Sequence, residues 1–177
     1  MKMLSTLAAA AAASLALAAL PAAASLVSFT AHLDGASEAP SNGSTAFGDA
    51  LVTLDDTAFT VAVHVAFSGL TQPATAGHIH CCTAIPFTGV VGVFQGFTGF
   101  PNTTAGTYDR TFTLSSARFN TLFTGIEQGR AYVNIHDATF PGGEIRGFLV
   151  PEPGTLALVL GGLGLAGAAA RYRRGAD

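Results

Sequence analysis

The chain contains 177 residues, of which 49% are hydrophobic and only 11% are charged, whereas a typical soluble domain has about 25% charged residues. This length accommodates one sizeable domain, and the hydrophobic content excludes a disordered chain. The formal net charge of −3 provides no basic surface, which excludes nucleic acid as a partner. The apolar excess is typical of a membrane protein, so the position of the apolar residues along the chain decides the class.

The first segment, residues 1–24, has the three parts of a secretory signal peptide. A single basic residue precedes a long apolar run, which ends at Pro21. Three alanines, Ala22 to Ala24, then supply the small residues that a signal peptidase recognises. We therefore expect cleavage after Ala24 and export of the chain that follows. The alternative is an uncleaved anchor helix.

The middle of the chain, residues 25–150, shows a succession of short segments typical of β-strands. The clearest runs from Phe59 to Phe67, where large apolar residues alternate with small or polar ones, as on a half-buried strand. Eight such segments are predicted to be strands: 26–34, 46–54, 59–67, 76–82, 90–95, 107–114, 130–136 and 144–150.

One short helix is expected among these strands, with its N-terminus capped by Ser115 or Ser116 and its end at Gly125. The region is therefore predicted to be an all-β, antiparallel, Greek-key-like β-sandwich or barrel of about eight strands. It contains four arginines, no lysine and nine acidic residues, a formal charge of −5. Such a surface suits neither phosphates nor anionic lipids.

Three histidines occupy positions where a sheet can bring them together. His78 and His80 flank one residue on a predicted strand, so their side chains point to the same face. His136 ends another predicted strand and shares its polar face with Tyr132 and Asn134. If the two strands are neighbours, three imidazoles converge, as in sites for zinc or copper. The alternative is a polar face without a metal, in which the imidazoles hydrogen-bond to Asn134, Asp137 or backbone groups.

Two cysteines, Cys81 and Cys82, directly follow these histidines. An exported protein normally pairs its cysteines. Adjacent ones have Cα atoms about 3.8 Å apart, below the usual disulfide range, which starts near ~4.4 Å. A vicinal disulfide is the first expectation. The alternative is that Cys82, which regular strand alternation places on the histidine face, becomes a further metal ligand.

The C-terminal segment, residues 151–177, combines three features in order. It opens with Pro151, Glu152 and Pro153, and sixteen uncharged residues follow. Its basic end contains three arginines: Arg171, Arg173 and Arg174. A helix of sixteen residues spans about 24 Å, slightly less than a ~30 Å hydrocarbon core, and the arginines are expected to stay on the cytoplasmic side.

This C-terminal segment resembles the PEP-CTERM sorting signal of Gram-negative bacteria. The resemblance implies transient anchoring in the inner membrane through a short transmembrane helix and recognition by an exosortase. It further implies cleavage near the Pro-Glu-Pro motif and transfer to the cell surface or an exopolysaccharide matrix. The alternative is a permanent single-span anchor.

Four motifs of the middle region are similar to the CHRD domain, which is named for chordin. They are the opening segment Leu33–Pro40, the Gly-His-Ile-His sequence at 77–80, and the Val-Asn-Ile-His and Phe-Pro-Gly-Gly-Glu-Ile-Arg-Gly sequences within 133–147. The resemblance covers Phe29–Val150 and departs from the family pattern at the two cysteines. It implies a fold rather than a defined activity.

The histidine spacing is also similar to that of the copper ligands of Cu/Zn superoxide dismutase, another Greek-key barrel. The bridging histidine, zinc loop and structural disulfide of that family have no counterparts in this sequence. The resemblance therefore implies metal ligation at His78, His80 and His136, but no dismutase activity.

The sequence contains no motif for nucleophilic catalysis or phosphate binding. We therefore expect an exported, non-enzymatic binding or structural protein of the cell surface or extracellular matrix. Its expected partners are signal peptidase, an exosortase, and exopolysaccharide or matrix proteins. The alternative is a copper- or zinc-binding protein with the histidine site similar to that of superoxide dismutase.

Overall fold

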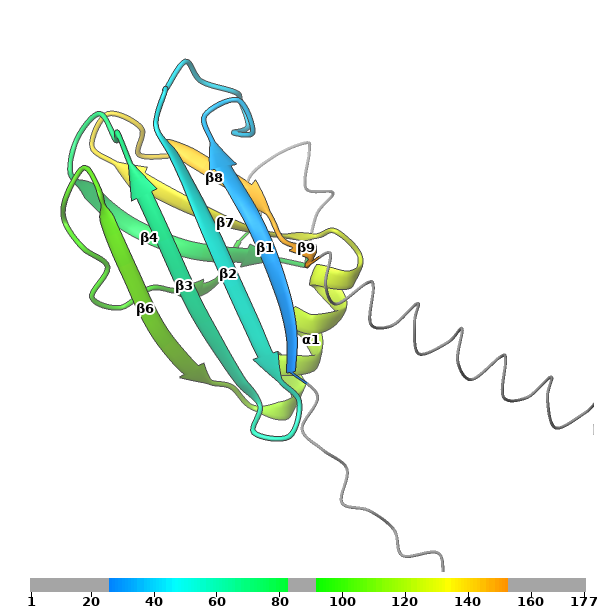
Figure 1. Ribbon diagram of the computed structural model, residues 1–177. Coiled ribbons are helices and arrows are strands. Elements are labelled where there is room, and N and C mark those ends of the chain that lie inside the picture. The colour runs from blue at the N-terminus through cyan, green and yellow to red at the C-terminus, as the bar shows by residue number, and fades with distance from the viewer. Residues whose placement is uncertain (1–25, 83–91, 153–177) are drawn as a thin grey trace, which may run out of the picture.

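The computed structural model describes residues 26–82 and 92–152, which form one curled antiparallel sheet with a single helix (Figure 1). The strands are β1 (Leu26–Asp34), β2 (Phe47–Asp55), β3 (Thr60–Ser68), β4 (Ala74–Cys81), β5 (Val93–Gly96), β6 (Gly106–Thr113), β7 (Ala131–Asp137), β8 (Ile145–Phe148) and β9 (Val150–Pro151). The helix α1 (Ser116–Glu127) lies between β6 and β7 in the chain. Each predicted strand segment therefore contains a strand, and the last segment contains two.

The last predicted strand is divided because the chain changes partner at Leu149. The N–H of Leu149 donates to the carbonyl of Ala131 in β7, over 3.0 Å. The next residue, Val150, pairs instead with Thr30 of β1. β8 thus pairs with both β7 and β1, whereas β9 pairs with β1.

The strands follow one path, β5-β4-β7-β8-β1-β2-β3-β6, with β9 attached to β1. The neighbours β4–β7, β8–β1 and β3–β6 are not consecutive in the chain, so the connections cross over as a Greek-key-like topology requires. The sheet curls so that β1, β2, β3 and β6 lie in front of β8, β7 and β4 (Figure 1). The described part of the chain is mostly antiparallel β-sheet with one short helix, as predicted, and it is curled into a half-barrel in which no ladder joins the outermost strands β5 and β6.

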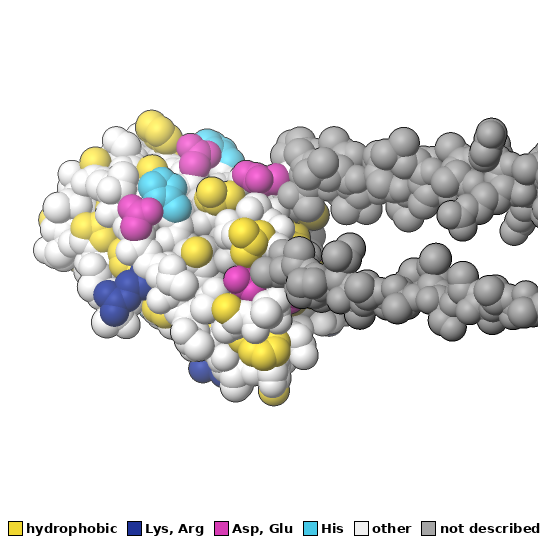
Figure 2. Space-filling view, turned by 60° about the horizontal axis from the view of Figure 1, so that its bottom comes forward, with side chains coloured by type: hydrophobic (Ala, Val, Ile, Leu, Met, Phe, Trp, Pro, Cys, Tyr) yellow, Lys and Arg dark blue, Asp and Glu magenta, His cyan; other side chains and the backbone are white. Residues whose placement is uncertain are grey.

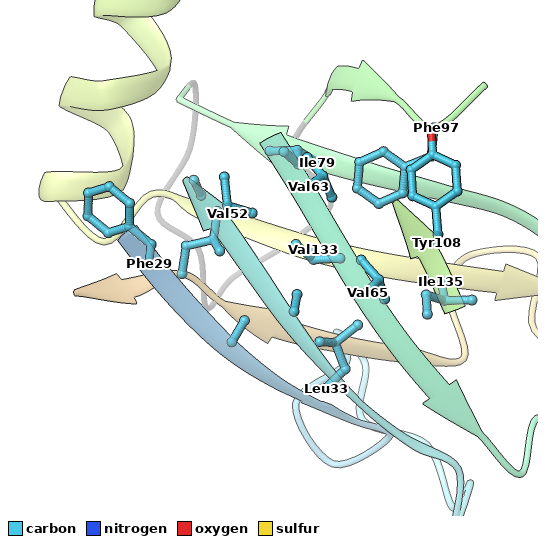
Figure 3. Close-up of a cluster of buried hydrophobic side chains, with 14 of the residues drawn as sticks. Phe29, Leu33, Val52, Val63, Val65, Ile79, Phe97, Tyr108, Val133 and Ile135 are labelled. Atoms are coloured by element: carbon cyan, nitrogen blue, oxygen red, sulfur yellow. The ribbon is translucent and has the colours of Figure 1, made fainter. Parts of the chain in front are cut away.

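The inside of the curl is filled by alternate residues of the strands. On β3, Val61, Val63, Val65 and Phe67 are all buried, as their alternation in the sequence predicts. Val63 and Val65 face the side chains of Val133 and Ile135 of β7 across this space (Figure 3). Apolar burial between the two halves of the sheet therefore holds the curl together.

Aromatic rings close the side of the curl that hydrogen bonds leave open. Phe97, directly after β5, stacks on Tyr108 of β6 with ring centroids 5.2 Å apart (Figure 3). Phe100 packs against Tyr108 and Phe67, each at 5.2 Å. A Cβ at Gly77 would lie 2.8 Å from the Phe97 ring, so glycine at this position lets the rings approach β4 closely.

The helix begins as predicted and ends later than predicted. The Ser115 side chain accepts from the N–H of Arg118, which makes it the N-cap. Gly125 lies inside α1 and does not end it, because at that point the helix rests on the Cys81–Cys82 pair, and a Cβ would collide with both sulfurs. The glycine in the left-handed region is Gly129, with φ +67°, just beyond the end of the helix.

The predicted signal peptide and the predicted C-terminal transmembrane helix lie outside the described residues, as do Pro153, Arg171, Arg173 and Arg174. Within the described ranges, no helix has the length and apolar character needed to cross a membrane. Pro151 pairs with Phe29 of β1, and the N–H of Glu152 donates to the carbonyl of Ser28 over 3.2 Å. The sheet therefore extends two residues into the segment that opens at residue 151.

Phe97→Ala should lower the free energy of unfolding by about 3–5 kcal/mol, because truncating a buried phenylalanine removes apolar burial and leaves a cavity. The matched control is Phe47→Ala, at a side chain that is 53% exposed, with an expected loss below about 1 kcal/mol. Urea unfolding of both variants measures the difference. Equal losses would show that the aromatic cluster does not hold the open side of the half-barrel.

Candidate metal centre

β4 and β7 are adjacent strands, and their register brings the three predicted histidines together. The pairs across the ladder are His78 with Asn134, His80 with Tyr132, and Ala76 with His136. One ligand nitrogen from each of His78, His80 and His136 lies within 4.8 Å of the others. The sequence alone left the adjacency of the two strands open, and the structure confirms it.

Two of the imidazoles are in direct contact. Nδ1 of His78 lies 3.1 Å from Nε2 of His136, and Nδ1 of His136 lies 3.1 Å from the carbonyl oxygen of Pro141. A carbonyl only accepts, so Nδ1 of His136 carries a proton and donates it to Pro141. In the neutral ring Nε2 of His136 is then an acceptor, and Nδ1 of His78 donates to it. A metal ion held by these two nitrogens would displace that proton.

The carbonyl that fixes the ring of His136 belongs to an anchored turn. The buried carboxylate of Asp137 accepts from the N–H of Phe140 at 2.6 Å and from the N–H of Gln72 at 2.7 Å. The turn that follows is closed by the N–H of Gly143, which donates to the carbonyl of Phe140 at 3.0 Å. Metal-binding histidines commonly donate their second ring N–H to a carbonyl in this way, which fixes the tautomer.

His80 is held by its cross-strand neighbour. Its ring stacks on Tyr132 with centroids 4.8 Å apart and planes within 6° of parallel. His80 is 3% exposed, and Tyr132 is also buried. The guanidinium of Arg146 lies 5.0 Å from the centroid of the Tyr132 ring, a cation–π contact. This packing limits the rotamers of His80 and keeps it on the face shared with the other two imidazoles.

A second buried polar network lies next to the histidines, on the side of β8. The amide of Asn134 donates to a carboxylate oxygen of Glu38 over 2.5 Å, and Nε of Arg146 donates to the carbonyl of Ser37. Burial raises the pKa of Glu38 to about 7, against the opposing effect of Arg146. Asn134 thus hydrogen-bonds to Glu38, whereas the three histidines contact one another and the turn at Pro141.

Burial also determines the protonation of the histidine cluster. It lowers the pKa of His78 to about 4, and the nearby rings of His136 and His80 act in the same direction. The pKa of His136 is lowered by burial, although the hydrogen bond to Pro141 opposes this. Both rings are therefore neutral at pH 7, and each has a nitrogen lone pair for a metal ion.

The prediction of Cys82 as a metal ligand is wrong, and the predicted vicinal disulfide is confirmed. Cys81 and Cys82 are bonded to each other, with Cα atoms 3.7 Å apart. Strand alternation stops at Cys81, because Cys82 has φ +92° and turns out of β4 toward α1. The ring closes only two adjacent residues, so it contributes about 1 kcal/mol by loop-closure entropy, less than half of what a 15-residue loop gives.

The other two histidines form separate pairs on the exposed surface. Nδ1 of His32 lies 2.9 Å from the carboxylate of Asp49, and Nδ1 of His64 lies 2.6 Å from that of Asp109. Histidine side chains lying against acidic ones are visible on the surface in Figure 2. Their positions on β1, β2, β3 and β6 place them on the other half of the sheet from the cluster.

Comparison with known proteins now gives the family. Residues 29–149 match the family model of the CHRD domain. The chain belongs to the CHRD domain family. Residues 149–174 match the PEP-CTERM protein-sorting motif, which implies export and processing by an exosortase. No curated protein and no solved structure matches this chain. The resemblances of the sequence motifs to the CHRD domain and to the PEP-CTERM signal are thus confirmed.

The motif residues of this CHRD domain mainly connect its loops. Glu144 is fully buried, and its Oε1 accepts from the hydroxyls of Ser44 at 2.7 Å and Thr71 at 2.8 Å. The N–H of Thr71 donates to the same carboxylate at 2.9 Å. The amide of Asn42 donates to the backbone carbonyls of Gly143 and Glu144. These bonds join the β1–β2, β3–β4 and β7–β8 loops at the end of the sheet that carries His136.

Sequence reasoning found the three histidines and missed the groups that hold them. Tyr132 was placed on the polar face, but its stacking on His80 depends on register, which no local pattern specifies. The metal-free alternative predicts Asp137 as a hydrogen-bond partner of the imidazoles, but in the structure its carboxylate anchors the turn; this role and the carbonyl of Pro141 were not predicted. The acidic residue directly after His136, followed by a Pro-Gly-Gly turn, is the sequence signal that could have indicated them.

Protonation of His78 should destabilise the folded, metal-free chain as the pH falls from about 6.5 to about 4, whereas Glu38, with its pKa raised to about 7, acts in the opposite direction. The pKa of His78 is about 4 in the folded chain against 6.5 for a histidine side chain in water, so the unfolded chain binds a proton in this window that the folded chain does not. Above pH 6.5 the imidazole of His78 is neutral in both states, and its contribution disappears. Urea unfolding of the chelator-treated chain at a series of pH values measures it. His78→Gln should reduce the slope of the free energy of unfolding against pH in this window. The control His32→Gln, outside the cluster, should keep the slope of the parent chain. Equal slopes in all three proteins would contradict the lowered pKa of His78.

Proposed function

We propose that this chain is an exported, non-enzymatic protein whose CHRD domain binds one transition-metal ion, copper or zinc, through His78, His80 and His136. The observation that supports this proposal is the approach of three imidazole nitrogens to within 4.8 Å of one another. Nitrogens bound to one ion at about 2.0–2.1 Å in a tetrahedral site lie roughly 3.3 Å apart. Nδ1 of His78 and Nε2 of His136, at 3.1 Å, are close to this spacing.

The donor chemistry and the electrostatics favour a divalent transition metal. Imidazole nitrogen suits copper and zinc, and a set of three leaves a coordination position for water or an added ligand. The low pKa of His78 and of His136 means that protons do not compete with the metal at neutral pH. The formal charge of −5 over residues 25–150 attracts cations to the domain.

We propose a binding role because the neighbours that the structure describes around the imidazoles fix the orientation of the rings. Tyr132 stacks on His80, and the Pro141 carbonyl fixes the tautomer of His136. The PEP-CTERM motif supports delivery to the cell surface or the extracellular space of a bacterium. In this proposal the chain is anchored transiently in the inner membrane, and the delivered CHRD domain holds its metal next to exopolysaccharide or matrix proteins.

Metal binding to the full chain tests the proposal. After loading with Cu²⁺ or Zn²⁺ and removal of excess ion, elemental analysis should find about one ion per chain in the parent protein, since one trihistidine set forms one site. The variant with His78, His80 and His136 all changed to alanine should retain none. The matched control is the double variant His32→Ala/His64→Ala, which should keep the ion.

Two results would contradict the proposal. Stoichiometric metal that persists in the triple variant would place the ion elsewhere, and absence of metal from the parent chain would leave the cluster as a polar sheet face. The non-enzymatic part is tested separately, by disproportionation of superoxide. The copper-loaded chain should be no faster than the same concentration of copper held by free histidine, and a faster rate that is lost on His78→Ala would overturn it.

A further inference from the structure

The Cys81–Cys82 disulfide lies where β4 meets α1, and its two residues differ in exposure. Cys81 is 4% exposed and belongs to the apolar core. Cys82 is partly exposed and lines a surface hollow of about 400 Å³. The other described residues around this hollow all belong to α1 or to its C-terminal end: Asn120, Thr121, Thr124, Gly125 and Gln128. One sulfur is therefore within reach of an external thiol and the other is not.

This disulfide does not connect distant parts of the chain. It closes a ring of two adjacent residues, and disulfides that stabilise folds do so by closing long loops. It holds Cys82 at φ +92°, a conformation that L-residues rarely adopt. Opening the ring frees Cys82 from this constraint at the end of β4.

Helix α1 is fitted to the closed form of the pair. A Cβ on Gly125 would collide with the sulfurs of both cysteines, and Sγ of Cys82 lies 3.4 Å from the carbonyl oxygen of Thr121. Bonded sulfurs are about 2.05 Å apart. The sulfurs of two separate thiols cannot approach so closely, because atoms that are not bonded repel each other inside their van der Waals contact distance. The reduced pair therefore needs more room than the space beneath Gly125 provides.

We propose that the Cys81–Cys82 disulfide is a thiol–disulfide exchange site for dithiols, and that its reduction loosens the contact between β4 and α1. A thiolate of the dithiol enters the hollow and attacks Sγ of Cys82, which breaks the S–S bond and releases Cys81 as a thiolate that takes up a proton. The second thiol of the reagent attacks the mixed disulfide and releases Cys82. Two electrons and two protons pass to the protein, and the dithiol becomes a cyclic disulfide.

The exchange site is independent of the proposed metal site. His80 directly precedes Cys81, but its ring lies on the other face of β4, against Tyr132. Reduction is followed by thiol counting and by the exchange of backbone amides in α1. Failure of metal binding would therefore leave this inference unaffected.

The test uses the purified full chain in its folded state. Dithiothreitol should convert the protein to a form with two thiols that iodoacetamide alkylates, and glutathione should form a mixed disulfide on Cys82, located by mass spectrometry of peptides. After reduction, hydrogen exchange of the amides of Gly125 to Gln128 should accelerate at least about tenfold, because the packing of this turn is lost. The variant Cys81→Ser/Cys82→Ser should show no change on addition of dithiothreitol.

A second pair of variants tests the route through the hollow without touching the cysteines. Thr124→Trp, at an exposed position that lines the hollow, should slow reduction by about tenfold, since access controls the exchange rate. Glu127→Trp, exposed on the same helix but outside the hollow, should not slow it. A disulfide that resists dithiothreitol in the folded chain, an adduct on Cys81, or unchanged exchange in α1 after reduction would each overturn the inference.

Discussion

The antiparallel ladder between β4 and β7 is the constraint on which the chemistry of this protein depends. Its register sets His80 against Tyr132 and His78 against Asn134, and it places His136 at the end of the same face. The same ladder pairs Cys81 with Ala131 before the chain turns away at Cys82. A shift by one residue would send the histidines into the core, because side chains alternate between the faces of a strand.

The β1–β2 loop partly covers the sheet face that carries the histidines. Residues on β4 and β7 have the apolar core on one side, while on the other the β1–β2 loop brings Ser37 and Glu38 against Arg146 and Asn134. Burial lowers the pKa of His78 and raises that of Glu38, so both groups favour their neutral forms at moderately low pH. A partly buried face with neutral imidazoles is suited to a metal ion, which would supply the charge that the side chains lack.

Much of this could be predicted from the sequence, because it depends on local patterns. The alternation from Phe59 to Phe67 predicts a strand, and a histidine on either side of Ile79 predicts two rings on one face. The features that were missed depend on contacts between distant segments. The end of α1 was misplaced because the glycine at position 125 accommodates two sulfurs of β4 rather than a turn. Cys82 was a candidate ligand because alternation was extended one residue beyond the strand.

The central claim is that three imidazoles of one sheet face bind one metal ion without sulfur. X-ray absorption at the zinc edge of the zinc-loaded chain tests this most directly. The account predicts nitrogen neighbours at about 2.0 Å, with the outer-shell scattering of about three imidazole rings, and no sulfur near ~2.3 Å. A sulfur neighbour, or scattering from a single imidazole, would contradict it.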